Sequence, residues 1–198
     1  MSEAATTEHP TNTGISHNKL AMWVFLGSEC LLFGALISTY LLYRNEFHTG
    51  PAPGDVFDIP FTSVSSFVLL MSSLTMVLAL SALKRGDIRN NRLWLLTTAL
   101  LGALFIGGQV YEFTSFVREG LGFTTSPFSS AFFTLTGFHG IHVSLGIVML
   151  MSLLISSLRG NLKEKNSETV EIVGLYWHFV DVVWIFIFTV IYLVPNPT

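Results

Sequence analysis

Cysteine, charge and clusters of basic residues are all scarce in this sequence of 198 residues. Charged residues make up 12% of the chain, about half of the roughly 25% found in soluble globular domains. The single cysteine, Cys30, lies inside an apolar stretch, which excludes an intrachain disulfide and a cluster of thiolate ligands. The ten Lys and Arg residues are scattered, and no run of them would follow a phosphate backbone, so nucleic-acid binding is excluded.

Apolar residues are abundant, at 51% of the chain, and the mean hydropathy is +0.59. They form five long blocks, and most of the charges lie between the blocks. A helix needs about 20 residues to cross roughly 30 Å of hydrocarbon, and each block is that long. Helices are predicted because lipid offers no partner for open backbone groups. The predicted spans are residues 20–43, 63–83, 93–113, 129–158 and 170–194.

The sequence therefore predicts an all-α, polytopic membrane bundle of five transmembrane helices in a single domain, residues 19–198. Residues 1–18 are polar and lack a basic segment followed by an apolar run. We expect them to form a disordered cytoplasmic tail and not a cleaved signal peptide. Helix breakers separate the blocks at Pro51, Gly86, Gly122 and Gly160.

Orientation follows from the positions of the positive residues, which favour the cytoplasmic side. If five spans alternate, only Arg44 and Arg118 lie on one side of the membrane. This asymmetry predicts a cytoplasmic N-terminus and an external C-terminus. The other side holds Lys19, Lys84, Arg85, Arg89, Arg92, Arg159, Lys163 and Lys165.

Small residues at helical spacing mark candidate helix contacts, because they let two backbones approach where no hydrophobic force drives association. Small residues are also common in membrane spans generally, so for any one pair an incidental pattern is an equal alternative. The candidate sets are Gly27, Gly34 and Ser38; Ala99, Ala103 and Gly107; and Gly140 with Ser144.

Glu29 lies near the middle of the first predicted span. Placing a charge there costs about 2.5–3.5 kcal/mol on insertion scales, so we expect this carboxyl to be neutral or paired with a buried donor. Two interpretations stay open. The first is a proton-relay or protein-contact site, and the second is a neutral carboxyl that is hydrogen-bonded between helices.

Polar residues recur three apart in the last two spans, as His139 with His142 and as His178 with Asp181. This spacing puts each pair on one helix face. Imidazole is a common ligand for metals and haem, but two histidines so close on one helix cannot hold opposite faces of a haem. The favoured interpretation is a set of satisfied polar groups that fasten helices or subunits together, with Asp181 orienting His178.

Three further residues are unusual for a membrane span. Glu112 lies near the outer end of the third span, where we expect water within reach. Trp177 and Trp184 share a face of the last span, which is typical of packing or of an interface anchor. No phosphate loop, nucleophile elbow or zinc-protease pattern is present, so we predict no catalytic, metal-binding or cofactor-binding residue in this chain.

Two long motifs resemble those of subunit III of the haem-copper respiratory oxidases. Residues 136–143 (TGFHGIHV) are similar to its fourth-helix signature, and residues 176–184 (YWHFVDVVW) to its last-helix signature. Residues 28–29 (SE), 33–34 (FG) and 109–113 (QVYEF) match further segments, in the family's order. The resemblance covers nearly the whole chain from Lys19 onward.

This resemblance implies a non-catalytic subunit of a bacterial, proton-pumping oxidase that reduces dioxygen to water. In the family, subunit III packs against subunit I, which holds haem and copper, while subunit II holds or approaches the electron donor. Subunit III supports proton uptake, protects the enzyme during turnover and binds phospholipid. Glu29 matches the family's intramembrane carboxylate. Four residues match positions inside the bundle: His139, His142, His178 and Asp181.

The sequence departs from the seven-helix mitochondrial type and resembles the short bacterial form, so a complete lipid cleft within this chain is not implied. Phe138 favours cytochrome c as the electron donor, because quinol oxidases tend to carry threonine there. Expected partners are subunits I and II, a fourth subunit, lipids and a respiratory supercomplex in the bacterial plasma membrane.

Four alternatives stay open. The chain could be subunit III of a quinol oxidase or an accessory subunit of a nitric oxide reductase. It could also be an independent small transporter, which the buried Glu29, His178 and Asp181 would motivate, although broken helices and an inverted repeat are not evident. A redox-active membrane cytochrome is the fourth alternative, and the histidine spacing argues against it.

Overall fold

The computed structural model describes residue 14 and residues 16–46, 58–163 and 166–194. Over these residues, five helices are long and apolar enough to cross a membrane. The predicted all-α bundle of five membrane-spanning helices is therefore confirmed. The helices are α1 (His17–Tyr43), α3 (Ile59–Lys84), α4 (Ile88–Arg118), α5 (Pro127–Leu158) and α6 (Ser167–Phe188), which continues into a π-helical turn, η2 (Thr189–Leu193).

Every helix begins two to five residues before its predicted apolar span, because polar residues start it. Asp58 caps α3 by accepting a hydrogen bond from the Phe61 amide, and Asp87 caps α4 in the same way. Ser126 forms a reciprocal capping box at the start of α5. Hydropathy marks only the apolar stretch, so it misses these first turns. Most of the predicted tail, residues 1–13 and 15, lies outside the described residues, while residues 17 and 18 belong to α1.

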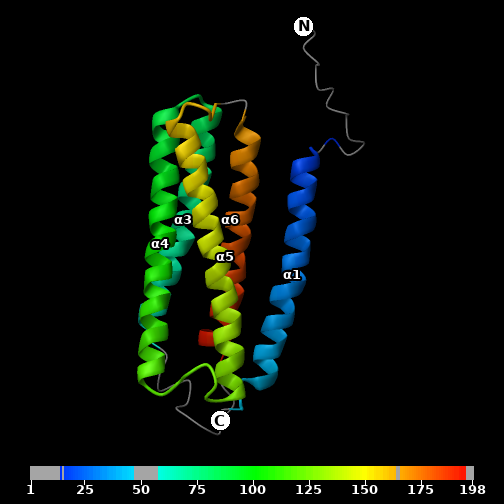
Figure 1. Cartoon of the computed structure of the whole chain (residues 1–198), viewed down its shortest axis with the longest axis vertical. Coiled ribbons are helices and arrows are strands. Elements are labelled where there is room, and N and C mark those ends of the chain that lie inside the picture. Colours follow the sequence, from blue (N-terminus) through cyan, green and yellow to red (C-terminus); the bar gives the residue numbers. More distant parts are fainter. Residues whose placement is uncertain (1–13, 15, 47–57, 164–165, 195–198) are drawn as a thin grey trace.

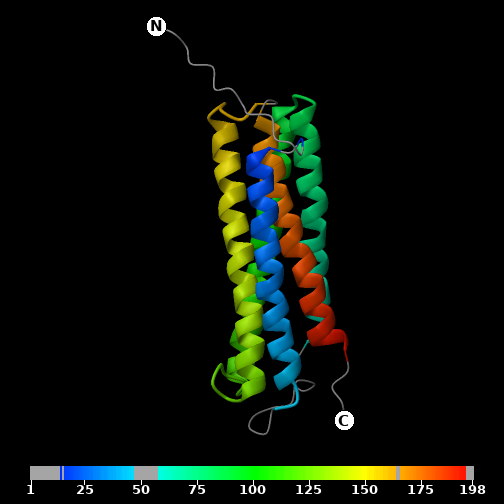
Figure 2. The ribbon, with the colours of Figure 1, turned by 90° about the vertical axis from the view of Figure 1, so that its right-hand side faces the viewer.

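Four helices, α3 to α6, form a compact cluster, and α1 lies along one edge of it (Figures 1 and 2). Within the described chain α1 packs on α5 and α6, while α3 packs on α4 and α6. Interactions at both ends join α1 to the last helical segment. At one end the Ser16 hydroxyl donates to the Glu168 carboxylate, and at the other an Arg44 guanidinium nitrogen lies 3.5 Å from the Val194 carbonyl oxygen.

The core of the cluster is centred on Trp177 of α6, whose side chain is fully buried. Its ring fills the space beside two glycines on neighbouring helices. A Cβ added at Gly102 of α4 or at Gly146 of α5 would lie 2.6 or 2.7 Å from the ring, closer than van der Waals contact permits. Close packing of helices in lipid thus depends here on two glycines that meet one large ring.

The predicted small-residue contacts fare less well than the helices. Gly27, Gly34 and Ser38 are exposed on the outer face of α1, so the prediction that they contact another helix is wrong within this chain. The prediction for α4 holds for Ala99, which is buried, and is wrong for Gly107, where an added Cβ would meet no other described helix within 4 Å.

Candidate functional site

Glu29 and His142 meet between α1 and α5, in the interior of the membrane-spanning region. Glu29 Oε2 lies 3.1 Å from His142 Nε2, and the two side chains are 14% and 11% exposed. The Phe33 ring packs edge-on against the imidazole, with ring centroids 5.0 Å apart. The sequence marked Glu29 and His142 as unusual separately, without a contact between them. The structure brings them together because α1 packs along α5.

The hydrogen bonds of His142 limit where its protons lie. Its Nδ1 is 2.7 Å from the Phe138 carbonyl oxygen, which can only accept, so Nδ1 carries a proton. The bond between Nε2 and Glu29 then holds a single proton. Either a protonated Glu29 donates to neutral imidazole, or imidazolium donates to a carboxylate. The proton can pass between these two atoms without moving the backbone, and Tyr176 fixes the helix there by donating to the His142 carbonyl at 2.9 Å.

His139 lies one turn away and is fully buried, but among the described residues neither of its ring nitrogens has a hydrogen-bond partner. Three aromatic rings surround it instead. Trp184 stacks on the imidazole with centroids 4.9 Å apart, and Phe33 and Phe105 approach edge-on. The prediction of a hydrogen-bonded polar group is therefore wrong for His139, which packs as an aromatic ring.

His178 and Asp181 meet through Ser73 of α3, not directly as predicted. The Ser73 hydroxyl donates to the Asp181 carboxylate, and its oxygen lies 2.9 Å from His178 Nδ1. Because the hydroxyl proton is given to Asp181, His178 is the donor of the second bond. Ser73 thus joins both residues of α6 to α3, while the second carboxylate oxygen of Asp181 is buried with no partner in the part of the chain that the structure describes.

The two tryptophans of α6 also bond to serines of α3, as expected for packing residues. Trp177 Nε1 donates to Ser72 at 2.9 Å, and Trp184 Nε1 donates to Ser66 at 2.8 Å. Ser66 and Ser72 were not among the contact residues predicted from the sequence. Their recurrence on one span, opposite a helix with large polar side chains, was the available signal.

Glu112 is buried between helices of the described chain. Its side chain accepts a hydrogen bond from the Thr62 hydroxyl of α3, and the expectation that water comes within reach of it stays a prediction. In the part of the chain that the structure describes, no three His, Cys, Asp or Glu side chains are grouped as a metal-ligand set.

The amino-acid sequence of the chain matches a known family. The family model described as cytochrome c oxidase subunit III matches residues 1–195. Cytochrome c oxidase subunit 3 of Bacillus sp. (strain PS3) is 44% identical over 174 residues, which cover 88% of this chain and 84% of that protein. Quinol oxidase subunit 3 of Bacillus subtilis (strain 168) is 40% identical over 189 residues, covering 96% and 92%. A probable quinol oxidase subunit 3 of Staphylococcus saprophyticus is 42% identical over 178 residues, covering 89% of each chain.

Proposed function

The chain belongs to the cytochrome c oxidase subunit III family and is a multi-pass bacterial membrane subunit of a terminal oxidase; we propose that it is the non-catalytic subunit III of a proton-pumping enzyme that receives electrons from cytochrome c. In this proposal subunit I holds haem and copper, and subunit II holds or approaches the electron donor. This chain stabilises subunit I, binds phospholipid along its apolar faces and supports proton uptake. Its N-terminus lies in the cytoplasm.

The hydrogen-bonded pair of Glu29 and His142 carries the proposed role in proton uptake. A pair that shares one proton in its hydrogen bond can take up a second proton on one side of the pair and release a proton on the opposite side. Glu29 lies 12 residues into α1, about 18 Å from its first residue at 1.5 Å per residue. If α1 spans the membrane, the pair lies about midway across it. A charged carboxyl is costly there, so an ionisable residue at this depth favours a functional role.

The choice of cytochrome c as donor is supported by Phe138, which precedes His139 in the motif shared with the family. The identities do not separate the two kinds of relative, because they are 44% and 40%. A quinol oxidase is therefore the second candidate, and the partner subunit decides between them.

The test is purification of the intact complex through a tag on this chain in mild detergent. Mass spectrometry identifies the partners, a reduced-minus-oxidised spectrum reports haem, and oxygen consumption is measured with reduced cytochrome c and with a quinol. We expect a haem-containing subunit I and turnover with cytochrome c. Turnover with quinol alone would show that the electron donor is a quinol and not cytochrome c. A colourless chain without oxidase partners would overturn the whole proposal.

A further inference from the structure

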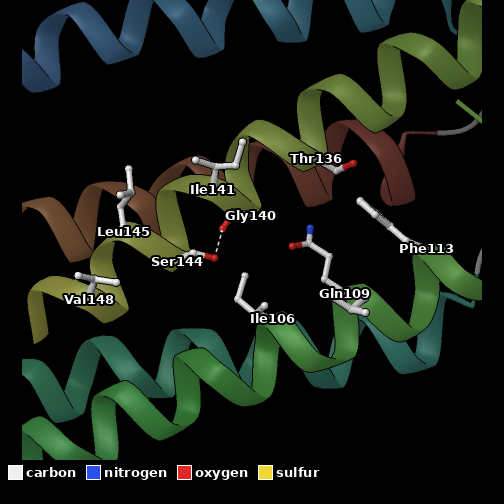
Figure 3. Close-up of a pocket in the computed structure, with 11 residues that line it drawn as sticks. Ile106, Gln109, Phe113, Thr136, Gly140, Ile141, Ser144, Leu145 and Val148 are labelled. Atoms are coloured by element: carbon white, nitrogen blue, oxygen red, sulfur yellow. Dashed lines mark hydrogen bonds between the residues drawn. The ribbon is translucent and has the colours of Figure 1, made fainter. Parts of the chain in front are cut away.

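An apolar groove runs between α4 and α5 (Figure 3). Its volume is about 380 Å³ and its α5 wall extends from Thr136 to Val148, about 18 Å at 1.5 Å per residue. Small residues form much of that wall: Gly137, Gly140 and Ser144. The Ser144 hydroxyl donates to the Gly140 carbonyl oxygen at 2.8 Å, so this side chain lies against its own helix.

Three polar side chains line this groove. The hydroxyls of Thr136 and Ser144 donate to backbone carbonyls of α5, whereas Gln109 has a donor without a partner among the described residues. Gln109 extends from α4 toward Gly140 (Figure 3), the residue is 7% exposed, and its Nε2 has no hydrogen-bond partner in the described part of the chain. Its Oε1 lies 3.1 Å from the position that a Cβ on Gly140 would take, so the amide sits where the glycine makes room. The last amide torsion of glutamine is broad, so the N–H groups can turn toward an occupant of the groove. In hydrocarbon an unpartnered amide is costly, so the site is complete only with an acceptor.

We propose that this groove binds a transmembrane helix of another subunit of the oxidase, and that a carbonyl or side-chain oxygen of that helix accepts a hydrogen bond from Gln109. This inference rests on the proposed function, since it requires an oxidase complex. Small residues let a second backbone approach closely, which is how helices associate in lipid. The length of the groove fits about three helical turns.

Two other occupants fit less well. An acyl chain would fill the apolar groove but offers no acceptor at this depth. Gln109 lies four residues, about 6 Å, inside the end of the apolar block at Phe113, whereas the polar part of a lipid lies outside the hydrocarbon. A compact ring ligand would cover only part of an open groove of this length.

The first experiment places a photo-crosslinking amino acid at Leu145 in the groove of the intact complex. Leu104 is the matched control, because it is similarly exposed on α4 but does not line the groove. We expect irradiation to join Leu145 to another oxidase subunit and Leu104 to give at least fivefold less of that product. Crosslinks from Leu145 to lipid alone, or to a second copy of this chain, would overturn the proposal.

The second experiment fills the groove from within. A Cβ added at Gly137 meets no atom of another described helix within 4 Å, so we expect the chain itself to tolerate Gly137→Leu. Gly107→Leu is the control, because Gly107 is equally open and lies outside the groove. Gln109→Leu removes the donor and also relieves an unpartnered amide, so any loss in that variant comes from the missing partner.

We expect Gly137→Leu to reduce recovery of one partner subunit about tenfold, in line with the cost of overpacking an interface, and Gln109→Leu to reduce it less. Gly107→Leu should leave the complex unchanged. Full recovery of every subunit with Gly137→Leu would show that the groove faces lipid. If the unmodified chain recovers no oxidase subunit at all, the proposed function fails, and that result is distinct from failure of the groove.

Discussion

Helices α1 and α6 are similar in length and hydropathy, but the protein uses them differently. Only Leu26, Phe33 and Tyr40 are buried in α1, one every seven residues, so α1 touches the cluster along a single narrow stripe. Ten residues are buried in α6, on several faces. Lipid is as apolar as a protein core, so hydropathy alone cannot distinguish an edge helix from a central one.

Polar bonds separate the two helices further. Helix α6 is joined to α3 by the bonds from Trp177, Trp184 and the Ser73 junction. Helix α1 is joined to the cluster by the Glu29–His142 bond inside the membrane and by Lys19 to Glu171 at one end, 3.0 Å apart. The central helix α6 is held by packing and hydrogen bonds together, whereas the edge helix α1 is held by a few separate contacts.

The largest difference should appear on truncating a tryptophan in each helix. Trp177→Ala removes a fully buried ring that contacts Gly102 and Gly146, and should cost about 3–5 kcal/mol of stability. Trp23→Ala on the exposed face of α1 should cost within about 0.5 kcal/mol. Thermal retention of subunits in the purified complex measures both. A comparable loss from Trp23→Ala would mean that a partner subunit covers that face.

The next effect concerns the junction between α6 and α3. Ser73→Ala leaves the Asp181 carboxylate without a hydrogen-bond partner and frees His178, at a cost of about 1–3 kcal/mol. His178→Leu should cost less, because Asp181 keeps its bond to Ser73. This order reverses the expectation from sequence that His178 is the direct partner of Asp181. Melting temperatures of the two variant complexes decide it, and a milder loss from Ser73→Ala would contradict the geometry.

Glu29→Gln tests the bond that holds α1 inside the membrane. The amide N–H of glutamine can still donate to His142 Nε2, so assembly should be intact. Because an amide cannot pass on a proton, turnover should fall several-fold at high pH, where proton uptake limits the rate, and little at low pH. The pH profile of oxygen consumption is the measurement. An unchanged profile would reduce Glu29 to a packing residue.

A smaller effect is expected at the end of α1. Lys19→Ala removes the ion pair with Glu171, whose side chains are 28% and 34% exposed. Pairs exposed to this degree contribute about 0–1 kcal/mol and are screened by salt. The variant should therefore lose a small amount of stability at low ionic strength and none at high ionic strength. Equal losses at both would show that Lys19 acts through packing.

Asp87 provides a baseline that depends on neither helix. Hydrogen bonds from the backbone amide and then the side chain of Asn90 lower the pKa of this carboxyl. A carboxyl with a lowered pKa in the folded protein stabilises it above its ordinary pKa, and this contribution is lost as pH falls through the folded value. Asparagine caps a helix as well as aspartate does, so Asp87→Asn should leave stability unchanged at neutral pH and reduce its loss in acid. Acid titration of thermal stability tests this expectation.

Two parts of the chain show how far sequence reasoning extends. The five spans were predictable because each must cover the hydrocarbon with apolar residues, and their polar caps were not weighed. Glu29 and His142 were both singled out, but their contact was not predicted, since it depends on how α1 packs against α5. The sequence did not predict packing or binding roles for Gly102, Gly146 and Gln109. A glycine or glutamine in a span is informative only when the side chain that faces it from another helix is known.

The sequence by itself determined that lipid surrounds the chain and that it has five spanning helices, and two motifs determined the family. Each of these depends on residues that are close together along the chain. Only the tertiary structure shows which helix is central and that Ser73 lies between His178 and Asp181. It also shows that His139 packs as an aromatic ring without a hydrogen-bond partner among the described residues. The physical reason is that lipid supplies no hydrophobic force to sort one apolar face from another. Shape and hydrogen bonding between distant residues do that sorting instead, and both exist only once the helices are assembled.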